Sequence, residues 1–200
     1  RPVRWLLALY GEILIPFTFA GIASGNTTRG LRFRQPEQMT VRNPAHYFRL
    51  MTAQGIVLDK RKRKEQILAH VRGLAEASGG QLLADDNLLS EVANLVETPT
   101  TLRGSFDPAH LNLPREVLIS AMKKHQRYFP IFKRGNPEQL LPYFLTVINK
   151  PIGGDDPFYG GELIVEGNEH VLRARFADAD FFVRDDRKHA LVDFLPRLGT

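Results

Sequence analysis

The sequence contains no cysteine among its 200 residues, and this absence excludes several kinds of site at once. Without a thiol the chain forms no disulfide, no zinc or iron–sulfur centre with cysteine ligands, and no cysteine nucleophile. Cysteine-poor chains are typical of reducing compartments, so we expect a cytoplasmic protein.

Long uninterrupted apolar runs are also missing. The longest apolar stretch, WLLALYGEILIPFTFAGIA at residues 5–23, is interrupted by Glu12 and Pro16. A transmembrane helix needs about 20 consecutive apolar residues, so we expect no membrane segment, and the first residues do not have the pattern of a signal peptide. The chain does not begin with methionine. We expect it to be an internal portion of a longer protein.

Catalytic signatures are absent as well. The sequence has no G-x-S-x-G, no P-loop, no G-x-G-x-x-G and no H-E-x-x-H, and Ser105 in RGSFDP has no obvious base nearby in the sequence. The adjacent aspartates at 155–156 and 185–186 lie in loops or on helices, where paired acids usually cap a helix or face solvent. The sequence therefore predicts no self-contained catalytic site and no metal site.

Charge is distributed unevenly along the chain. Residues 1–64 carry 12 basic and 3 acidic side chains, residues 65–120 carry 3 and 8, and residues 121–200 carry 12 and 11. Such asymmetry is typical of a surface that faces a polyanion, but a solvated basic face produces the same pattern. Charge alone leaves both interpretations open.

Hydrophobic periodicity and turn residues predict the elements. We expect paired strands over 3–22, a turn-rich loop over 23–33, a helix capped by Asn43 and begun by Pro44, and a short strand at 55–59. Helices at 60–78 and 85–96, a strand at 98–106 and a helix from Pro114 to 125 follow. A strand pair at 128–133 and 140–149, joined by RGNPEQ, precedes helix from Glu162 to about Phe194.

Strands that come in pairs predict an α+β fold with a largely antiparallel sheet flanked by helices, not a Rossmann sheet. We divide the chain into an α/β module at residues 1–160 and a helical segment at residues 161–200. The helical segment leads toward a further domain or packs on the first as one unit.

Four basic segments are candidates for phosphate binding. Residues 60–64 are five consecutive cations, which point all round a helix and so form no single patch. Arg29, Arg32 and Arg34 stand beside Leu31 and Phe33, and in a strand Leu31 and Phe33 would face the core while Arg32 and Arg34 would share the other face. A third group follows the helix at 114–124, where Tyr128 could stack on a base, although cations also stabilise a helix C-terminus by roughly 0.3–1 kcal/mol each. The fourth group, at 173–188, alternates with acids that can form pairs such as Asp180–Arg184.

Several blocks together resemble the β subunit of the bacterial two-subunit glycyl-tRNA synthetase. They are AMKKHQRYFPIF, LLPYFLTVIN and EGNEHVLRARFADADFFVRDDRK, followed by LPRLGT and preceded by RPVRWLLALYG, RGLRF and LLSEVANLVETP. The resemblance covers essentially the whole chain. It implies an enzyme that joins glycine to its tRNA with ATP through a glycyl-adenylate.

The resemblance also implies how the work is divided. ATP and Mg would be used by the separate α subunit, with no cofactor in this portion. The partners would be glycine tRNA, the α subunit and the remaining domains of the β subunit. The module is similar to the editing-type α/β module of the phenylalanyl-tRNA synthetase β subunit. Glycine is the smallest amino acid, so steric exclusion can reject larger ones without editing.

We therefore predict a module that positions the tRNA acceptor end and supports packing between domains, with no catalytic residue of its own. A hydrolytic editing module and a purely structural scaffold are the alternatives. The predicted RNA-binding residues are Arg29, Arg32, Arg34, Lys123, Lys124, Arg127, Arg173, Arg175, Arg184, Arg187 and Lys188.

Overall fold

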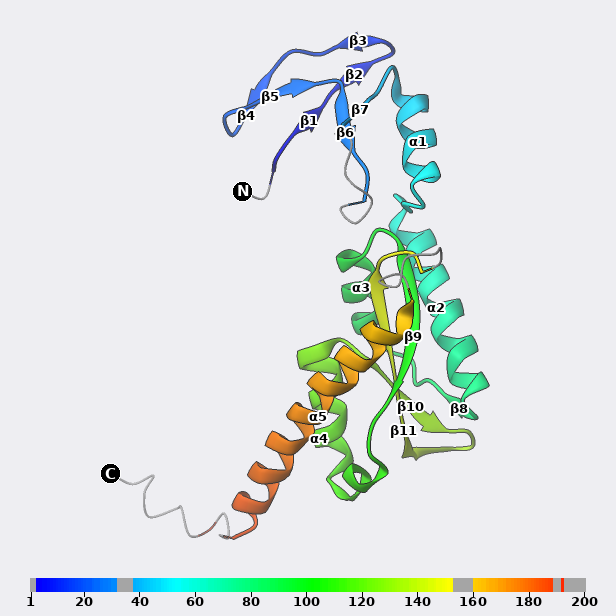
Figure 1. Cartoon of the computed structure of the whole chain (residues 1–200), viewed down its shortest axis with the longest axis vertical. Coiled ribbons are helices and arrows are strands. Elements are labelled where there is room, and N and C mark those ends of the chain that lie inside the picture. Colours follow the sequence, from blue (N-terminus) through cyan, green and yellow to red (C-terminus); the bar gives the residue numbers. More distant parts are fainter. Residues whose placement is uncertain (1–2, 32–37, 153–159, 189–191, 193–200) are drawn as a thin grey trace, which may run out of the picture.

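A computed structural model describes residues 3–31, 38–152, 160–188 and 192, and it confirms the predicted α+β fold. Figure 1 shows a small β-rich body at the N-terminal end and a larger α/β body below it, joined by the first two helices. The last helix crosses the larger body and extends beyond it.

Short strands build the N-terminal body. The first of them, β1, pairs in parallel with β5, while β4–β5, β2–β3 and β6–β7 are antiparallel pairs. The predicted strand pair is thus divided into shorter pieces, and the segment predicted as a loop contributes β5 and β6. Gly11 adopts φ +60° in the turn between β2 and β3. The bounds are β1 Leu6–Leu7, β2 Leu9–Tyr10, β3 Ile13–Leu14, β4 Thr18–Phe19, β5 Ile22–Gly25, β6 Thr27–Arg29 and β7 Gln38–Thr40.

Helix α1 (Pro44–Ala53) begins as predicted. The Asn43 side chain accepts a hydrogen bond from the His46 N–H at 2.8 Å, which satisfies one of the free amides of the first turn. Gly55, at φ +74°, follows the end of the helix. The strand predicted at 55–59 does not form: the Val57 N–H donates to the loop carbonyl of Glu97, and none of the described strands pairs with this segment.

A four-stranded antiparallel sheet forms the centre of the larger body. Its strands lie in the order β8-β10-β11-β9. Hairpin β10–β11 turns through residues 134–135, a shorter connection than predicted, because β11 begins before the predicted strand. The bounds are β8 Gly80–Gln81, β9 Pro99–Ser105, β10 Phe129–Lys133 and β11 Asn136–Asn149.

Helices cover both faces of this sheet, as the alternation of side chains in β10 requires. On one face, α2 (Lys60–Ala77) and α3 (Asp86–Leu95) pack over Phe129 and Ile131. On the other, α4 (Arg115–Ser120), a π-helical turn (Ala121–His125) and α5 (Gly161–Asp186) pack over Phe132. A 3₁₀ turn (Pro108–Asn112) follows β9.

The C-terminal helix is anchored by its middle turns. Leu172 and Phe176 are fully buried in the same core cluster as Phe132, and Phe106 meets Phe176 edge-on with ring centroids 5.0 Å apart. The predicted helix from Glu162 is confirmed as far as Asp186. Its predicted end near Phe194 lies outside the described residues. No helix in the described part of the chain is long and apolar enough to cross a membrane.

Candidate nucleic-acid interface

Two of the predicted phosphate-binding cations tie the π-helical turn to α3. The Lys123 ammonium lies 2.7 Å from Asp85 Oδ2, and the Arg127 guanidinium lies 2.6 Å from Glu91 Oε1. Arg127 also adopts a left-handed backbone, with φ +57°. Both cations therefore already have a carboxylate partner within the chain. Lys124, between them in sequence, is exposed and makes no ion pair with any described residue.

Tyr128 does not lie on the surface, and its predicted role as a base-stacking residue is wrong. Only 3% of its surface is exposed. Its ring stacks on Phe144 with centroids 4.5 Å apart, and its hydroxyl donates to Asn168 Oδ1. The cause is local: the Tyr128 N–H bonds the Met122 carbonyl, which turns the chain inward as it enters β10.

Along α5 the interleaved acids neutralise some cations and leave others free. The predicted Asp180–Arg184 pair is present at 2.7 Å, and Lys188 lies 3.0 Å from Asp185. Arg173, Arg175 and Arg187 are exposed and form no ion pair within the described residues. By helical geometry, Arg173 and Arg187 lie on the same side of α5 as Arg184, whereas Arg175 lies on the opposite side, toward α4.

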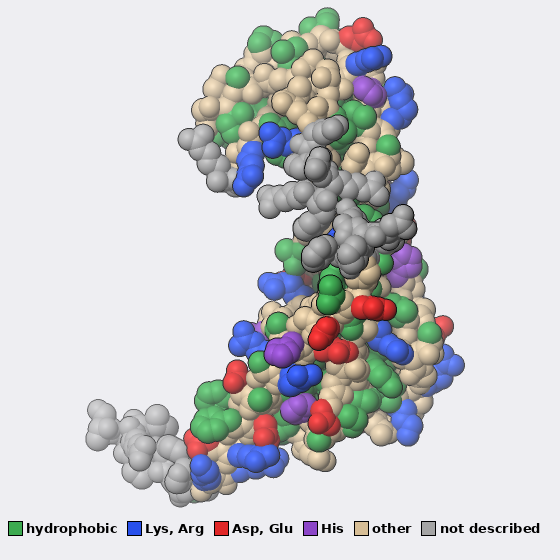
Figure 2. Space-filling model, in the orientation of Figure 1, with side chains coloured by type: hydrophobic (Ala, Val, Ile, Leu, Met, Phe, Trp, Pro, Cys, Tyr) green, Lys and Arg blue, Asp and Glu red, His purple; other side chains and the backbone are tan. Residues whose placement is uncertain are grey.

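At the N-terminal body only one of the three candidate arginines lies in the described residues. Arg29 ends β6, is exposed, and holds its guanidinium carbon 6.0 Å from the centre of the Trp5 ring. Leu31 is buried, as predicted. Arg32 and Arg34 lie outside the described residues. The eleven predicted residues thus fall on separate parts of the molecule, and in Figure 2 blue and red side chains are mixed over the larger body.

The run of basic residues at 60–64 contains a structural arginine. The Arg63 guanidinium donates to the carbonyl oxygens of Val57 and Leu58, at 2.5 and 3.0 Å, and to that of Ala93 at 3.0 Å. It thereby ties the start of α2 to the end of α3. The prediction that the run forms no single patch is consistent with this arrangement, because Arg63 turns inward while Arg61 and Lys62 are exposed.

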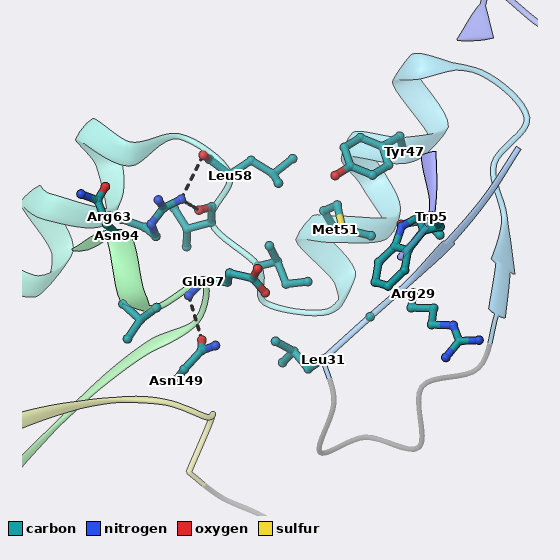
Figure 3. Close-up of a pocket in the computed structure, with 15 residues that line it drawn as sticks. Trp5, Arg29, Leu31, Tyr47, Met51, Leu58, Arg63, Asn94, Glu97 and Asn149 are labelled. Atoms are coloured by element: carbon teal, nitrogen blue, oxygen red, sulfur yellow. Dashed lines mark hydrogen bonds between the residues drawn. The ribbon is translucent and has the colours of Figure 1, made fainter. Parts of the chain in front are cut away.

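A cavity of about 670 Å³ lies between the two bodies, and sequence reasoning missed it. Figure 3 shows its walls: α1 and the first strands on one side, and the ends of α3 and β11 on the other. Its lining comes from residues 5–149, and no local motif signals a site assembled over that distance. The lining includes Trp5, Thr28, Arg29, Leu31, Tyr47, Met51, Ile56, Leu58, Arg63, Asn94, Glu97 and Asn149.

Polar groups converge on this cavity from opposite walls. In Figure 3 the Tyr47 hydroxyl and the Glu97 carboxylate both point into the space between the bodies. Burial raises the pKa of Tyr47, and the nearby negative charge of Glu97 raises it further, so the phenol keeps its proton at neutral pH. Asn149 Oδ1 accepts from the N–H groups of Glu97 and Thr98, which fixes the loop that carries the carboxylate.

The described lining of the cavity is poor in the side chains that usually act as a nucleophile or a general base. Among its described lining residues there is no histidine, lysine, serine or aspartate, and Glu97 is the one carboxylate. Elsewhere, the Ser105 hydroxyl donates to Glu169 Oε1 at 2.8 Å, and the same oxygen accepts from the Ser105 N–H. That pair joins β9 to α5. The described residues contain no cluster of three or more metal-ligating side chains.

Comparison with known proteins decides the family. The family model described as glycyl-tRNA synthetase beta subunit matches residues 1–200. The chain belongs to this family. The resemblance stated from the sequence blocks is therefore confirmed.

Relatives of this family come from distant organisms. The chain is 42% identical over 198 residues to a glycine--tRNA ligase beta subunit of Listeria welshimeri, and 41% identical over 199 residues to one of Myxococcus xanthus. It is also 42% identical to the chloroplastic/mitochondrial glycine--tRNA ligase 2 of Arabidopsis thaliana. At least 99% of this chain is covered in each case, but the chain spans only 28%, 27% and 18% of the relatives' lengths.

Proposed function

We propose that this chain serves glycyl-tRNA synthesis as part of the β subunit of glycine–tRNA ligase, and that it binds and positions the acceptor end of tRNA. Its membership of the β-subunit family over the whole chain carries the proposal. The α subunit would supply the catalytic centre with ATP and Mg, and the enzyme would work in the cytoplasm. The other domains of the β subunit would pack around this portion.

The free cations of α5 support a contact with RNA. Arg173 and Arg187 lie on one side of the helix, exposed and without a carboxylate partner among the described residues. Each cation that neutralises a phosphate releases condensed counterions, so binding through them weakens as salt increases. Arg184, on the same side, is already paired with Asp180 and provides a matched control.

The test is binding of glycine tRNA by the complete α–β enzyme across a salt series. If Arg173 and Arg187 each neutralise one phosphate, the double variant Arg173→Ala/Arg187→Ala should flatten the slope of log K against log salt by about 1.4–1.8. Arg184→Ala should leave the slope close to that of the wild type. Equal slopes for all three proteins would remove this side of α5 from the tRNA contact.

A scaffold role has one observation in its favour. The N-terminal strands expose large apolar side chains with Glu12 as the one charge among residues 5–28. An exposed apolar surface of this kind marks contact with protein rather than with nucleic acid. Ile13→Ser/Phe19→Ser should weaken association of the β subunit with its protein partners if the scaffold role holds. The exposed set is Trp5, Tyr10, Ile13, Leu14, Ile15, Phe17 and Phe19.

Editing is the remaining alternative, and the cavity is the place where an editing site would lie. A hydrolytic site there would depend on Glu97 as its general base. We expect the complete enzyme to release no amino acid from seryl- or alanyl-tRNA beyond the uncatalysed rate, and Glu97→Gln to change nothing. Release that Glu97→Gln abolishes would establish editing and refute a purely binding role.

A further inference from the structure

We propose that the cavity between the two bodies binds one unstacked base of single-stranded RNA, and that in tRNA this base belongs to the single-stranded 3′ end. The inference rests on the proposed function and specifies where that function is carried out. Sequence-selective proteins read RNA mostly where bases are free of a helix, in loops and ends. A cavity of about 670 Å³ lies within the roughly 300–1,000 Å³ range of small-molecule sites.

Trp5 provides the surface on which a base can stack. It is the one tryptophan of the chain, and 43% of its surface is exposed although it lines the cavity. The Arg29 guanidinium lies over its ring at 6.0 Å. Stacking on an aromatic ring contributes about 1–3 kcal/mol per base, and an arginine beside the ring adds cation–π attraction and a phosphate partner.

A second, smaller hollow shares three lining residues with the first. It has a volume of about 240 Å³, and Trp5, Thr28 and Arg29 line both hollows. Its other described lining residues are Arg4, Thr27 and Gln38, so it presents cations and hydrogen-bonding groups without a carboxylate. This composition suits phosphate and ribose. The two hollows together can therefore hold a nucleotide, with the base on one side of the Trp5–Arg29 pair and the backbone on the other.

The far wall of the cavity selects the base. Glu97 presents a carboxylate, which accepts hydrogen bonds and repels phosphate, so the group that enters must be neutral and carry N–H donors. Adenine, cytosine and guanine carry exocyclic amines with two N–H donors, whereas uracil offers only its ring N3–H. The tRNA 3′ end, CCA, consists of amine-bearing bases alone. Tyr47, kept protonated by burial and by Glu97, adds a hydroxyl donor for a ring nitrogen or carbonyl.

Apolar side chains complete the enclosure between these polar groups. Leu31 and Met51 are 3% exposed and Ile56 is 9% exposed, and together they form a small core cluster under the cavity. A rigid apolar floor with few polar groups around it is the usual composition of a site for a flat ring. The cavity is thus built for a base and not for the phosphates of a duplex.

The single tryptophan supplies the assay. The 200-residue chain, with folding verified by a cooperative thermal transition, is titrated with the RNA trinucleotide CCA, and with UUU, AMP and ATP as separate probes. A base that stacks on Trp5 quenches its fluorescence. We expect saturable quenching by CCA and at least several-fold weaker binding of UUU. A folded chain with no change under CCA, or with quenching by AMP or ATP but none by CCA, would overturn the proposal.

Substitutions in the cavity test which side chains bind CCA. Anisotropy of dye-labelled CCA should show roughly 5- to 150-fold weaker binding for Trp5→Ala, corresponding to 1–3 kcal/mol of stacking, and weaker binding for Arg29→Ala. Glu97→Gln should reduce the preference for CCA over UUU. The exposed Glu65→Gln on α2 is the matched control and should change neither value. An unchanged preference in Glu97→Gln would refute the assignment of the base edge to Glu97.

The two proposals fail in different ways. If the complete enzyme binds glycine tRNA with the expected salt dependence but CCA leaves Trp5 unaffected, the cavity is not the base site and the proposed function stands. If CCA binds at Trp5 but Trp5→Ala/Arg29→Ala leaves tRNA binding and glycylation by the complete enzyme unchanged, the contribution of this site to the proposed function is refuted.

Discussion

The Tyr128 hydroxyl donates to Asn168 Oδ1 at 2.5 Å and joins the start of β10 to α5 across the sheet face. Asn168 in turn donates from Nδ2 to the Ile164 carbonyl one turn earlier, at 2.6 Å. The ring of Tyr128 meanwhile lies flat on Phe144 in the core. One side chain therefore connects the hairpin, the core and the C-terminal helix.

Removal of this hydroxyl should destabilise the chain. Tyr128→Phe keeps the ring stack but leaves the Asn168 oxygen without its donor, so we expect a loss of about 1–2 kcal/mol in the free energy of unfolding at pH 7. Urea unfolding measures it. Tyr10→Phe, at a residue 77% exposed, should stay within about 0.5 kcal/mol of wild type.

The raised pKa of Tyr128 predicts that the stability of the fold decreases at alkaline pH. Burial raises the pKa of Tyr128 from 10.0 to about 12. Below pH 10 the phenol is protonated in both states, so stability does not depend on it; above pH 10 the unfolded chain releases the proton first, so stability falls. The loss should approach about 1.4 kcal/mol per pH unit between pH 10 and 12. Tyr128→Phe should lack this part of the alkaline slope, and an identical slope in both proteins would contradict the assignment.

Local signals predicted the helices well because the residues that start each helix or form its buried side lie within the helix segment itself. Asn43 followed by Pro44 specified the start of α1, and the apolar spacing of Ile67, Val71 and Ala75 specified the buried side of α2. The strand predicted at 55–59 failed because an apolar segment becomes a strand only beside a partner strand. No local pattern distinguishes an apolar segment that has a partner strand from one that has none.

The candidate site was harder to predict, for a physical reason. Sequence shows where cations are but not which acids reach them: Lys123 meets an aspartate 38 residues away, and Arg127 meets Glu91 from another helix. The one pair that could be predicted, Asp180–Arg184, follows from helical spacing alone. The cavity beside Trp5 depends on how two bodies meet, which no short segment encodes.

The Lys123–Asp85 contact predicts a loss of stability in acid. Burial alone raises the pKa of Asp85, but hydrogen bonds from Lys123 and from the Leu88 N–H outweigh it and hold the pKa below its usual value. The contribution is therefore present above pH 4 and is lost as the pH falls through the lowered pKa. Asp85→Asn keeps the helix cap but loses the charge, and should cost about 1 kcal/mol at pH 7 in urea unfolding.

The pH dependence separates the charge from the cap. The difference between wild type and Asp85→Asn should shrink below pH 4, because protonation removes the charge that the variant already lacks. Asp86→Asn, in the first turn beside it and exposed, should show a smaller cost. A cost for Asp85→Asn that is constant down to pH 2 would mean that the Lys123 contact contributes nothing through charge.

Arg63 should behave differently from its basic neighbours. Its guanidinium serves three carbonyl oxygens with a planar set of donors that lysine does not have. Arg63→Lys should therefore cost about 1–3 kcal/mol in the free energy of unfolding, while Arg61→Lys, at an exposed position of the same turn, should cost less than about 0.5 kcal/mol. Thermal melts of the two variants measure the contrast, and equal melting temperatures would refute the structural role of Arg63.

Two glycines give opposite predictions for the same substitution. A Cβ on Gly104 in β9 would lie 2.3 Å from Cζ of Phe144, which is fully buried and cannot move without disturbing the core. Gly104→Ala should cost about 1–3 kcal/mol through overpacking. Gly73 lies inside α2 with nothing within 4 Å of an added Cβ, so Gly73→Ala should stabilise the chain by about 0.5–1 kcal/mol. A urea midpoint that rises for Gly104→Ala would show that β9 packs less closely on Phe144 than its geometry requires, and one that falls for Gly73→Ala would contradict the helix-propensity argument.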